Sequence, residues 1–447
     1  MRVLLVSPNR ERLPDPVFPL GLSYIASALK RDGHDVTSLD LCFEDNIDEA
    51  IRLSVERAMP GVVGLSLRNI DNVSYPRSIC YIDHYKNVVK LIRKYTDAVI
   101  VLGGAGLTIM PGAFMDALNA DYAVAGEGES VFCKLVGNLE QRVIPEEKII
   151  KADAAQSRDW TEIIPDRSLF DIEKYYEHGG MLNIQTKRGC PFRCIYCSYP
   201  LIEGRKFRMR TPADVADELK EIVKNTGVRH FFIVDSIFNY PVEFAERICD
   251  ALIERNLDIS WTCYGTPPGM TDRLAEKMKR AGCTSIEFGI DSLIDEYLDV
   301  LKKGYNYQSI RQASEICTKH GIKHCLFIFV GAPGETADTA KMNFDRLDAL
   351  GADVSMIMAG IRIFPNTVLA DIAQEELGID KHSISIKPVY YISPGVMKAM
   401  DSIVEDIKKN HPKWILPGFE INIDERLQAL LRKAGIRGSL WEELTKR

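Results

Sequence analysis

The sequence has no apolar run that approaches the length of a membrane-spanning helix, so we expect no membrane span. It also lacks the charged and apolar regions of a secretory signal peptide. The chain opens instead with Met1-Arg-Val-Leu-Leu-Val6, a pattern typical of a buried strand. These absences predict a cytoplasmic protein.

A surplus of positive charge is missing as well. The chain has 63 Asp and Glu against 56 Lys and Arg, which gives a formal net charge of −7. General polyanion binders carry the opposite balance, so we do not expect nucleic acid as a partner. Hydrophobic residues make up 46% of the chain and charged residues 27%. With 447 residues, the chain is too long to fold around a single hydrophobic core. The composition therefore predicts a soluble globular protein of two or three domains.

Cysteines are scattered, except in one short loop. Eight of the eleven stand singly in apolar or helical contexts, and we interpret most of them as reduced core residues. The other three, Cys190, Cys194 and Cys197, lie close together just after the strand-like run 181–187. Three thiolates at this spacing would repel one another unless a cation or a cluster neutralised them. The loop therefore predicts a metal centre.

No fourth Cys or His lies near this loop. Iron–sulfur clusters are usually held by four thiolates, so three would leave one iron open. The alternatives are a zinc site, which needs four closed ligands, or three unrelated buried cysteines. The string Cys-x3-Cys-x2-Cys, with Tyr196 before the last Cys, resembles the signature of the radical S-adenosylmethionine (SAM) superfamily. The resemblance implies a [4Fe-4S] cluster whose open iron chelates SAM, and cleavage of SAM to a 5′-deoxyadenosyl radical.

Residues 1–150 predict a doubly wound α/β domain. Short apolar runs alternate with helix-like segments, as in strands that are buried on both faces of a parallel sheet. The runs span residues 3–8, 36–41, 62–67, 98–102 and 122–125. Such sheets bind ligands at the carboxyl ends of their strands. No Gly-x-Gly-x-x-Gly string follows the first strand, so NAD is disfavoured.

A domain of this kind ahead of a radical SAM loop resembles the Rossmann-like cobalamin-binding domain of B12-dependent radical SAM enzymes. The resemblance implies a set of cofactor-binding residues at the strand ends: Ser7, Asn9, Ser66, Arg68, Asn69, Gly103, Gly104, Gly106, Gly126, Glu127 and Gly128. The Asp-x-His-x-x-Gly string that supplies a histidine to cobalt in B12 mutases is absent. Family members place the residue beneath cobalt in the loop after the third strand, so the resemblance implies Arg68 or Asn69 for this position. Alternatively, Arg68 pairs with Asp71 or caps a helix, and the domain is a flavodoxin-like module without cobalamin.

The remaining chain is divided by its pattern into a linker, a barrel and a tail. Residues 151–180 lose the strand pattern and predict an interdomain linker over the barrel mouth. Residues 181–370 predict a partial (β/α)6 TIM-type barrel, in which chemistry occurs at the carboxyl ends of the strands. Residues 371–447 predict a small helical segment that closes the barrel mouth.

The carboxyl ends of the predicted barrel strands supply Asp235, Ser236 and Arg362 as candidate cofactor contacts. The resemblance to the radical SAM family further implies contacts by Tyr196, Glu287, Gly289, Asp291, Ser292, Gly331 and Gly334. Each polar member is alternatively a helix cap or part of a structural ion pair. Tyr390 and Tyr391 are candidate catalytic residues that would donate a proton or contact the substrate, with buried packing as the alternative.

Together the two resemblances imply a cobalamin-dependent C-methyltransferase. The 5′-deoxyadenosyl radical would remove hydrogen from an unactivated carbon, which then takes a methyl group from methylcobalamin, so that each turnover consumes two SAM. The implied partners are SAM, methylcobalamin and a one-electron donor such as flavodoxin or ferredoxin. The candidate substrate is a protein or peptide side chain, such as a glutamine of methyl-coenzyme M reductase. The alternatives are a B12-dependent radical SAM cyclase or rearrangement enzyme, and a non-catalytic cobalamin sensor.

Overall fold

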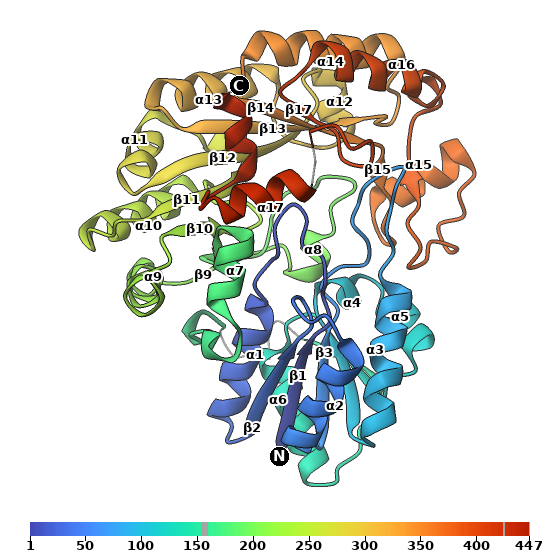
Figure 1. Ribbon diagram of the computed structural model, residues 1–447. Coiled ribbons are helices and arrows are strands. Elements are labelled where there is room, and N and C mark those ends of the chain that lie inside the picture. Colours follow the sequence, from blue (N-terminus) through green and yellow to red (C-terminus); the bar gives the residue numbers. More distant parts are fainter. Residues whose placement is uncertain (153–159, 423–424, 447) are drawn as a thin grey trace.

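The computed structural model describes residues 1–152, 160–422 and 425–446. Its N-terminal domain is built on a parallel six-stranded sheet in the order β2-β1-β3-β4-β5-β6 (Figure 1). The strands are β1 (Arg2–Ser7), β2 (Asp35–Asp40), β3 (Val62–Ser66), β4 (Val99–Gly103), β5 (Tyr122–Ala125) and β6 (Ile149–Lys151). The first five confirm the predicted runs, whereas β6 was not predicted. The chain reverses direction across the sheet between β1 and β3, which makes their loops a topological switch point.

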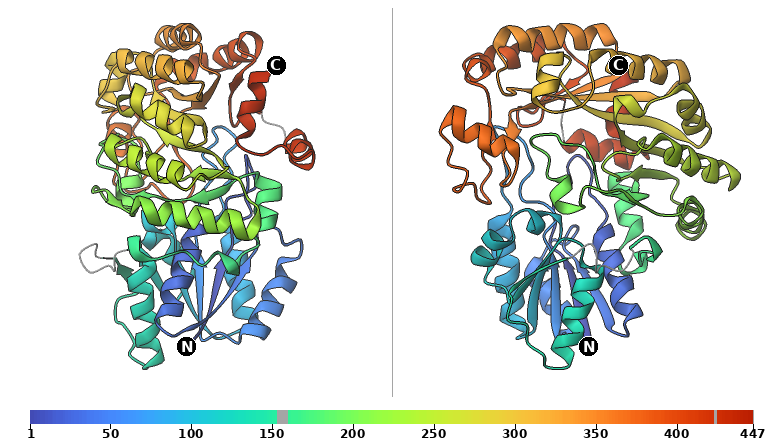
Figure 2. Two further views of the ribbon diagram at one scale, coloured as in Figure 1. Left: turned by 90° about the vertical axis from the view of Figure 1, so that its left-hand side faces the viewer. Right: turned by 180° about the vertical axis from the view of Figure 1, so that it is seen from behind.

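Helices cover both faces of this sheet because its strands are apolar on both sides (Figure 2). One face packs against α1 (Leu20–Arg31) and α6 (Gly128–Glu140), in a core that continues into the second domain. The other face packs against α2 (Ile47–Ala58), α3 (Ile82–Tyr95) and α5 (Pro111–Leu118), while the short α4 (Ala105–Ile109) follows β4. The doubly wound fold is confirmed.

The second domain is a partial barrel of seven parallel strands in the order β17-β14-β13-β12-β11-β10-β7. They are β7 (Leu182–Ile184), β10 (His230–Ile233), β11 (Ser260–Gly265), β12 (Cys283–Asp291), β13 (Lys323–Val330), β14 (Val354–Ala359) and β17 (Trp414–Ile415). Between successive strands run α9 (Pro212–Thr226), α10 (Val242–Glu254), α11 (Asp272–Arg280), α12 (Asp295–Val300), α13 (Tyr307–His320) and α14 (Ala337–Leu350). Six of the strands are the predicted ones, and β17 is an addition from the C-terminal segment.

The predicted linker packs on the N-terminal domain beside β2 and α1. Residues 153–159 of this segment lie outside the described residues. Helix α7 (Ile172–Gly179) places Tyr175 so that its hydroxyl donates to Asp40 over 2.7 Å. The Tyr175 ring meets Phe18 edge-on, with 5.4 Å between the ring centroids. The short 3-10 helices Trp160–Glu162 and Arg167–Leu169 precede α7.

The C-terminal segment lies against the barrel and combines helices with short strands. Its helices are α15 (Val368–Leu377), α16 (Pro394–Asn410), α17 (Glu425–Lys433) and the 3-10 helix η4 (Leu440–Lys446). Strand β16 (Tyr390–Tyr391) pairs with β15 (Ile361–Arg362), while β17 extends the barrel sheet beside β14. The segment is helical, as predicted, and adds two short strands that were not predicted. No helix in the described ranges is long and apolar enough to cross a membrane.

Candidate functional site

One cavity of about 2110 Å3 joins the carboxyl edge of the N-terminal sheet to the inner face of the partial barrel. Its volume exceeds the roughly 300–1,000 Å3 that is usual for a pocket holding one small ligand. All eleven predicted residues of the N-terminal domain line this cavity, from Ser7 to Gly128. Its opposite side is formed by inward-facing residues of the barrel strands, such as Asn183, Tyr264 and Phe327. Of the predicted barrel contacts only Glu287 lines it, and the cavity reaches Ser198 and Tyr199 just after the cysteine loop, while the three cysteines are not part of its lining.

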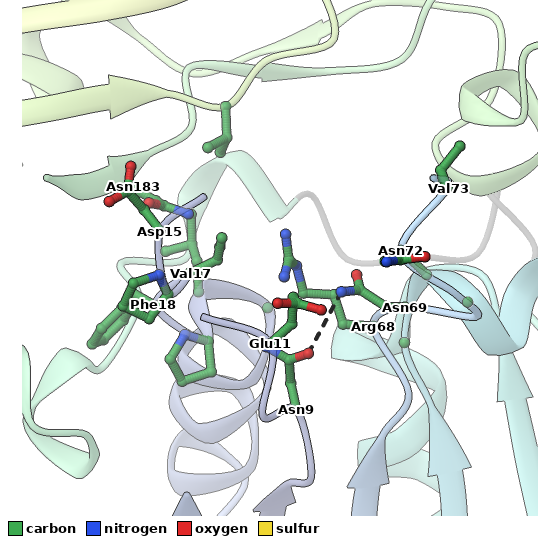
Figure 3. A pocket seen from close by; sticks show the side chains of 18 of the residues that line it. Asn9, Glu11, Asp15, Val17, Phe18, Arg68, Asn69, Asn72, Val73 and Asn183 are labelled. Atoms are coloured by element: carbon green, nitrogen blue, oxygen red, sulfur yellow. Dashed lines mark hydrogen bonds between the residues drawn. The ribbon is translucent and has the colours of Figure 1, made fainter. Parts of the chain in front are cut away.

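Arg68 extends into this cavity from the loop after β3 (Figure 3). Within the described part of the chain, no hydrogen-bond or ion-pair partner is recorded for its guanidinium, and burial lowers its pKa. Asp71 does not pair with Arg68, because it forms a buried ion pair with Arg362. The alternative in which Asp71 neutralises Arg68 is thereby excluded, and the cavity contains a cation that is not paired.

Two asparagines lie beside Arg68 and leave a polar atom unused. The Asn69 side chain donates a long hydrogen bond of 3.5 Å to the Asn9 oxygen. The Asn9 amide nitrogen Nδ2 is buried and has no partner among the described residues. A buried donor without a partner is costly unless a ligand satisfies it. This observation favours a bound group at the switch point between β1 and β3.

The glycines after β4 differ in what surrounds them. A Cβ atom on Gly104, whose φ is +101°, would lie 2.8 Å from the Leu67 carbonyl oxygen. Gly104 is thus required by the close approach of the β3 loop. A Cβ atom on Gly103 would meet nothing within 4 Å, since that residue faces open cavity. The backbone after β4 therefore leaves room for a large flat ligand.

The cysteine loop lies between β8 (Lys187–Arg188) and α8 (Tyr199–Ile202). Cys190 is buried, and Cys194 and Cys197 are partly buried; all three are free thiols. Burial raises the pKa of each thiol, to about 12 for Cys197, so ionised sulfurs here need a positive partner. Among the described residues, no three His, Cys, Asp or Glu side chains form a group that could hold a single metal ion. A cluster whose thiolates bind separate irons does not require such a group.

Residues beside this loop form a hydrogen-bonded group. The Lys303 Nζ donates to Asp291 Oδ2 over 2.7 Å and to the Gly289 carbonyl over 2.8 Å. The Tyr196 hydroxyl donates to the same carboxylate of Asp291. Three predicted residues, Tyr196, Gly289 and Asp291, are therefore brought together at the carboxyl end of β12, next to the cysteines.

Family models match both halves of the chain. The radical SAM superfamily model matches residues 184–347, and the B12-binding domain model matches residues 8–136. A tryptophan 2-C-methyltransferase of Streptomyces laurentii is 26% identical, over 84% of this chain and 74% of that protein. The chain thus combines a B12-binding domain with a domain of the radical SAM superfamily. Its cofactors are a [4Fe-4S] cluster, SAM and cobalamin.

Solved structures share the fold of this radical SAM enzyme. The methyltransferase TsrM of Kitasatospora setae, with tryptophan and a SAM analogue bound, aligns with a TM-score of 0.87 at 24% identity, covering 99% of this chain and 97% of that one. A cyclase also resembles the enzyme in sequence: the anaerobic magnesium-protoporphyrin IX monomethyl ester cyclase of Rubrivivax gelatinosus is 25% identical over 93% of this chain and 78% of that protein.

The residues present fit these groups. Cys190, Cys194 and Cys197 would hold the cluster, and the loops after β1, β3, β4 and β5 would hold cobalamin. The residues predicted to contact SAM lie at the neighbouring carboxyl ends of β10, β12 and β13. Some of their polar groups already form hydrogen bonds within the protein. Ser236 donates to the Gly189 carbonyl over 2.9 Å, and Ser292 donates to Asn343 over 3.1 Å. Gly331 and Gly334 lie in the turn after β13. In this turn the backbone amides of Gly331 and Ala332 donate hydrogen bonds to the Glu335 carboxylate.

Several predicted cofactor contacts are engaged within the protein instead. Asp235 is fully buried and pairs with Lys187 over 3.0 Å. Arg362 is buried against Asp71 at the domain interface over 2.9 Å. Glu127 lines the cavity, but its carboxylate is held by Arg208. The charges of Asp235, Arg362 and Glu127 are thus neutralised within the protein. These three residues fit the alternative in which they form structural ion pairs.

The two predicted catalytic tyrosines lie outside the cavity lining. The Tyr390 hydroxyl accepts a hydrogen bond from Ser78 over 2.9 Å, and its ring packs near Tyr75. The Tyr391 ring is completely buried, and its hydroxyl donates to Glu376. Both tyrosines thus pack against other residues of the protein, which is the alternative to a catalytic role.

The cavity also contains residues that the sequence pattern did not single out. Tyr264, at the carboxyl end of β11, is 37% exposed and lines the cavity. Trp441 reaches the barrel from η4, 154 residues beyond Glu287, and its indole nitrogen donates to that carboxyl group over 2.9 Å. The inward alternation of β11 would have indicated Tyr264, whereas nothing local indicates Trp441.

Proposed function

We propose that this enzyme transfers a methyl group to an unactivated carbon of a substrate held inside the partial barrel. The observation that carries the proposal is the cavity of about 2110 Å3, which runs from the loops of the N-terminal sheet to the inner face of the barrel and reaches Ser198 and Tyr199 beside the cysteine loop. With the cofactors bound, one SAM, reduced at the cluster by the electron donor, would supply the hydrogen-abstracting radical, and cobalamin would supply a methyl group that it takes from a second SAM, so two SAM would be consumed per turnover. The protein's contribution is to place the substrate between the two regions.

Residues of the chain exclude water from the reacting carbon. The barrel side of the cavity is lined by Phe232, Phe327, Phe329, Met356 and Met358. These side chains have no S–H or O–H bond from which a carbon radical could take back a hydrogen atom. The apolar wall therefore protects a reactive carbon and leaves orientation to the few polar residues.

Arg68 would lie beneath the cobalamin ring. Its unpaired guanidinium extends from the switch point between β1 and β3, where such sheets bind their ligands. A guanidinium is a poor metal ligand because it stays protonated. It would keep a coordinating water or strong base from the lower face of the ring.

The experiment is to incubate anaerobically reconstituted enzyme with SAM, a reductant and candidate substrates. The proposal predicts S-adenosylhomocysteine and 5′-deoxyadenosine together, along with a methylated product. A cyclase, the second candidate because of its similar sequence over 93% of the chain, would give only 5′-deoxyadenosine. A cobalamin sensor would give neither product.

The candidate substrate is a peptidyl side chain, such as the glutamine of methyl-coenzyme M reductase, and synthetic peptides test it directly. The proposed electron donor is flavodoxin or ferredoxin. A cytoplasmic location is proposed because a reducing compartment would keep all eleven thiols free, as the structure has them.

A further inference from the structure

A carboxyl group is buried in the barrel part of the cavity. Glu287 lies in the middle of β12, two residues before Gly289 and therefore on the same face, and it lines the cavity. The residue is only 7% exposed. Its position is deeper than the carboxyl end of the strand, where Asp291 contacts Tyr196 and Lys303. Glu287 is thus set apart from the region beside the cysteine loop.

This carboxyl group has no counter-charge. Its Oε1 accepts one hydrogen bond, from the neutral Trp441 indole over 2.9 Å. In the described parts of the chain Glu287 forms no ion pair, and Oε2 has no recorded partner. The charged groups that perturb it, Glu442 and Asp15, are carboxylates themselves. Both of those are paired, Glu442 with Lys323 and Asp15 with Arg432.

Aromatic and thioether side chains surround this group. Tyr264 is its direct partner in the register of β11 and β12, and Phe232 meets the Tyr264 ring edge-on at 4.9 Å. Trp441 packs in a cluster with Phe327 and Met356. Aromatic faces attract cations as well as apolar groups. A buried carboxylate in such a wall is costly unless a positive partner arrives.

The chamber beside Glu287 opens toward the cobalamin side. Tyr264 and Glu287 line the cavity from the barrel, and Arg68 lines the same cavity from the N-terminal domain.

We propose that Glu287 binds a protonated amine of the substrate. This inference rests on the proposed function, because it assumes that the barrel chamber holds the molecule to be methylated. In a peptide substrate the amine would be an N-terminal or lysine ammonium. The Glu287 carboxylate would anchor the cation, while the aromatic wall contacts the adjoining carbon skeleton.

The test uses the holoenzyme and two matched probes, 2-phenylethylammonium and the neutral 2-phenylethanol, with binding measured by calorimetry. We expect the wild type to prefer the ammonium by about tenfold or more, since hydrogen bonds to charged groups contribute about 1.5–3 kcal/mol. Glu287→Gln should abolish this preference while keeping the corrinoid absorbance of the wild type. Glu443→Gln is the matched control, because it removes another carboxylate that lines the cavity from η4; it should keep the preference.

The outcomes that overturn the inference are distinct. Equal binding of the two probes by the wild type, failure of both to bind, or a preference that survives Glu287→Gln would each exclude it. A loss of SAM affinity in Glu287→Gln with the amine preference intact would assign the residue to SAM instead. Because probe binding needs no turnover, an intact amine preference in an enzyme that never yields S-adenosylhomocysteine would refute the methyltransferase proposal alone.

Discussion

Asp71 and Arg362 form a buried ion pair across the two domains, with 2.9 Å between Oδ2 and Nε. Asp71 belongs to the loop after β3, and Arg362 belongs to β15 beside the barrel. Arg362 also donates to the Ile363 carbonyl over 2.6 Å. This pair fixes the cobalamin-binding loop relative to the barrel.

Breaking this ion pair should loosen the interface. We expect Asp71→Asn to lower the free energy of unfolding by about 3–5 kcal/mol, because it leaves the buried Arg362 cation without its counter-charge. Urea unfolding followed by fluorescence measures the change. The control is Asp258→Asn, whose pairing with Arg229 is exposed, and for which about 0–1 kcal/mol is expected. Equal effects of the two substitutions would contradict the role of the buried pair.

Each of the substitutions Cys190→Ala, Cys194→Ala and Cys197→Ala should prevent assembly of the cluster. The remaining two thiolates cannot hold a cubane that has only three protein ligands. Iron content and visible absorbance after anaerobic reconstitution measure the loss. Cys80→Ala is the control, because that half-buried thiol contacts the Ile386 carbonyl and should leave iron content unchanged.

Neighbouring glycines should separate stability from cofactor binding. Gly104→Ala places a methyl group 2.8 Å from the Leu67 carbonyl at a φ of +101°, and should cost about 1–3 kcal/mol of stability. Gly103→Ala places its methyl group in open cavity, so stability should stay within about 1 kcal/mol. Its corrinoid content should nevertheless fall, because the methyl occupies ligand space. Full cobalamin binding by Gly103→Ala would place the ring elsewhere.

Arg68→Gln should alter the bound corrinoid without destabilising the fold. The guanidinium has no recorded partner in the described chain, and Arg68 is exposed to the cavity, so its removal should change stability by less than about 1 kcal/mol. The visible spectrum of protein-bound cobalamin should shift, because the group beneath the ring has changed. An unchanged spectrum would show that Arg68 does not lie beneath the cobalamin ring.

Glu287 should make stability depend on pH. Burial raises its pKa from 4.5 to about 7 in the folded protein. Between these values the folded state retains a proton that the unfolded chain has lost, so the stabilisation is complete below pH 4.5 and is lost as the pH rises through about 7. Relative to Glu287→Gln, the wild type should lose up to about 3 kcal/mol between these limits. Urea midpoints at several pH values test this, with the exposed Glu221→Gln as control.

The sequence predicted most strands because parallel sheets bury both faces, which leaves continuous apolar runs such as Val62–Ser66. Strands β6 and β17 were missed because three and two residues carry no readable period. The cavity lining was predictable where residues follow a strand end, as for Arg68. It was not predictable where long-range pairing decides, since neither the Arg362 partner nor the approach of Trp441 leaves a local signal.

A second set of ion pairs joins the domains beside the cysteine loop, where Arg208 and Arg188 hold Glu127 and Glu129 of the B12-binding domain. Separating the two domains would leave these charged groups, and also Asp71 and Arg362, without their ion-pair partners. The corrinoid should therefore stay bound and be remethylated on the enzyme. The apoenzyme should acquire it more readily during folding than the folded holoenzyme exchanges it.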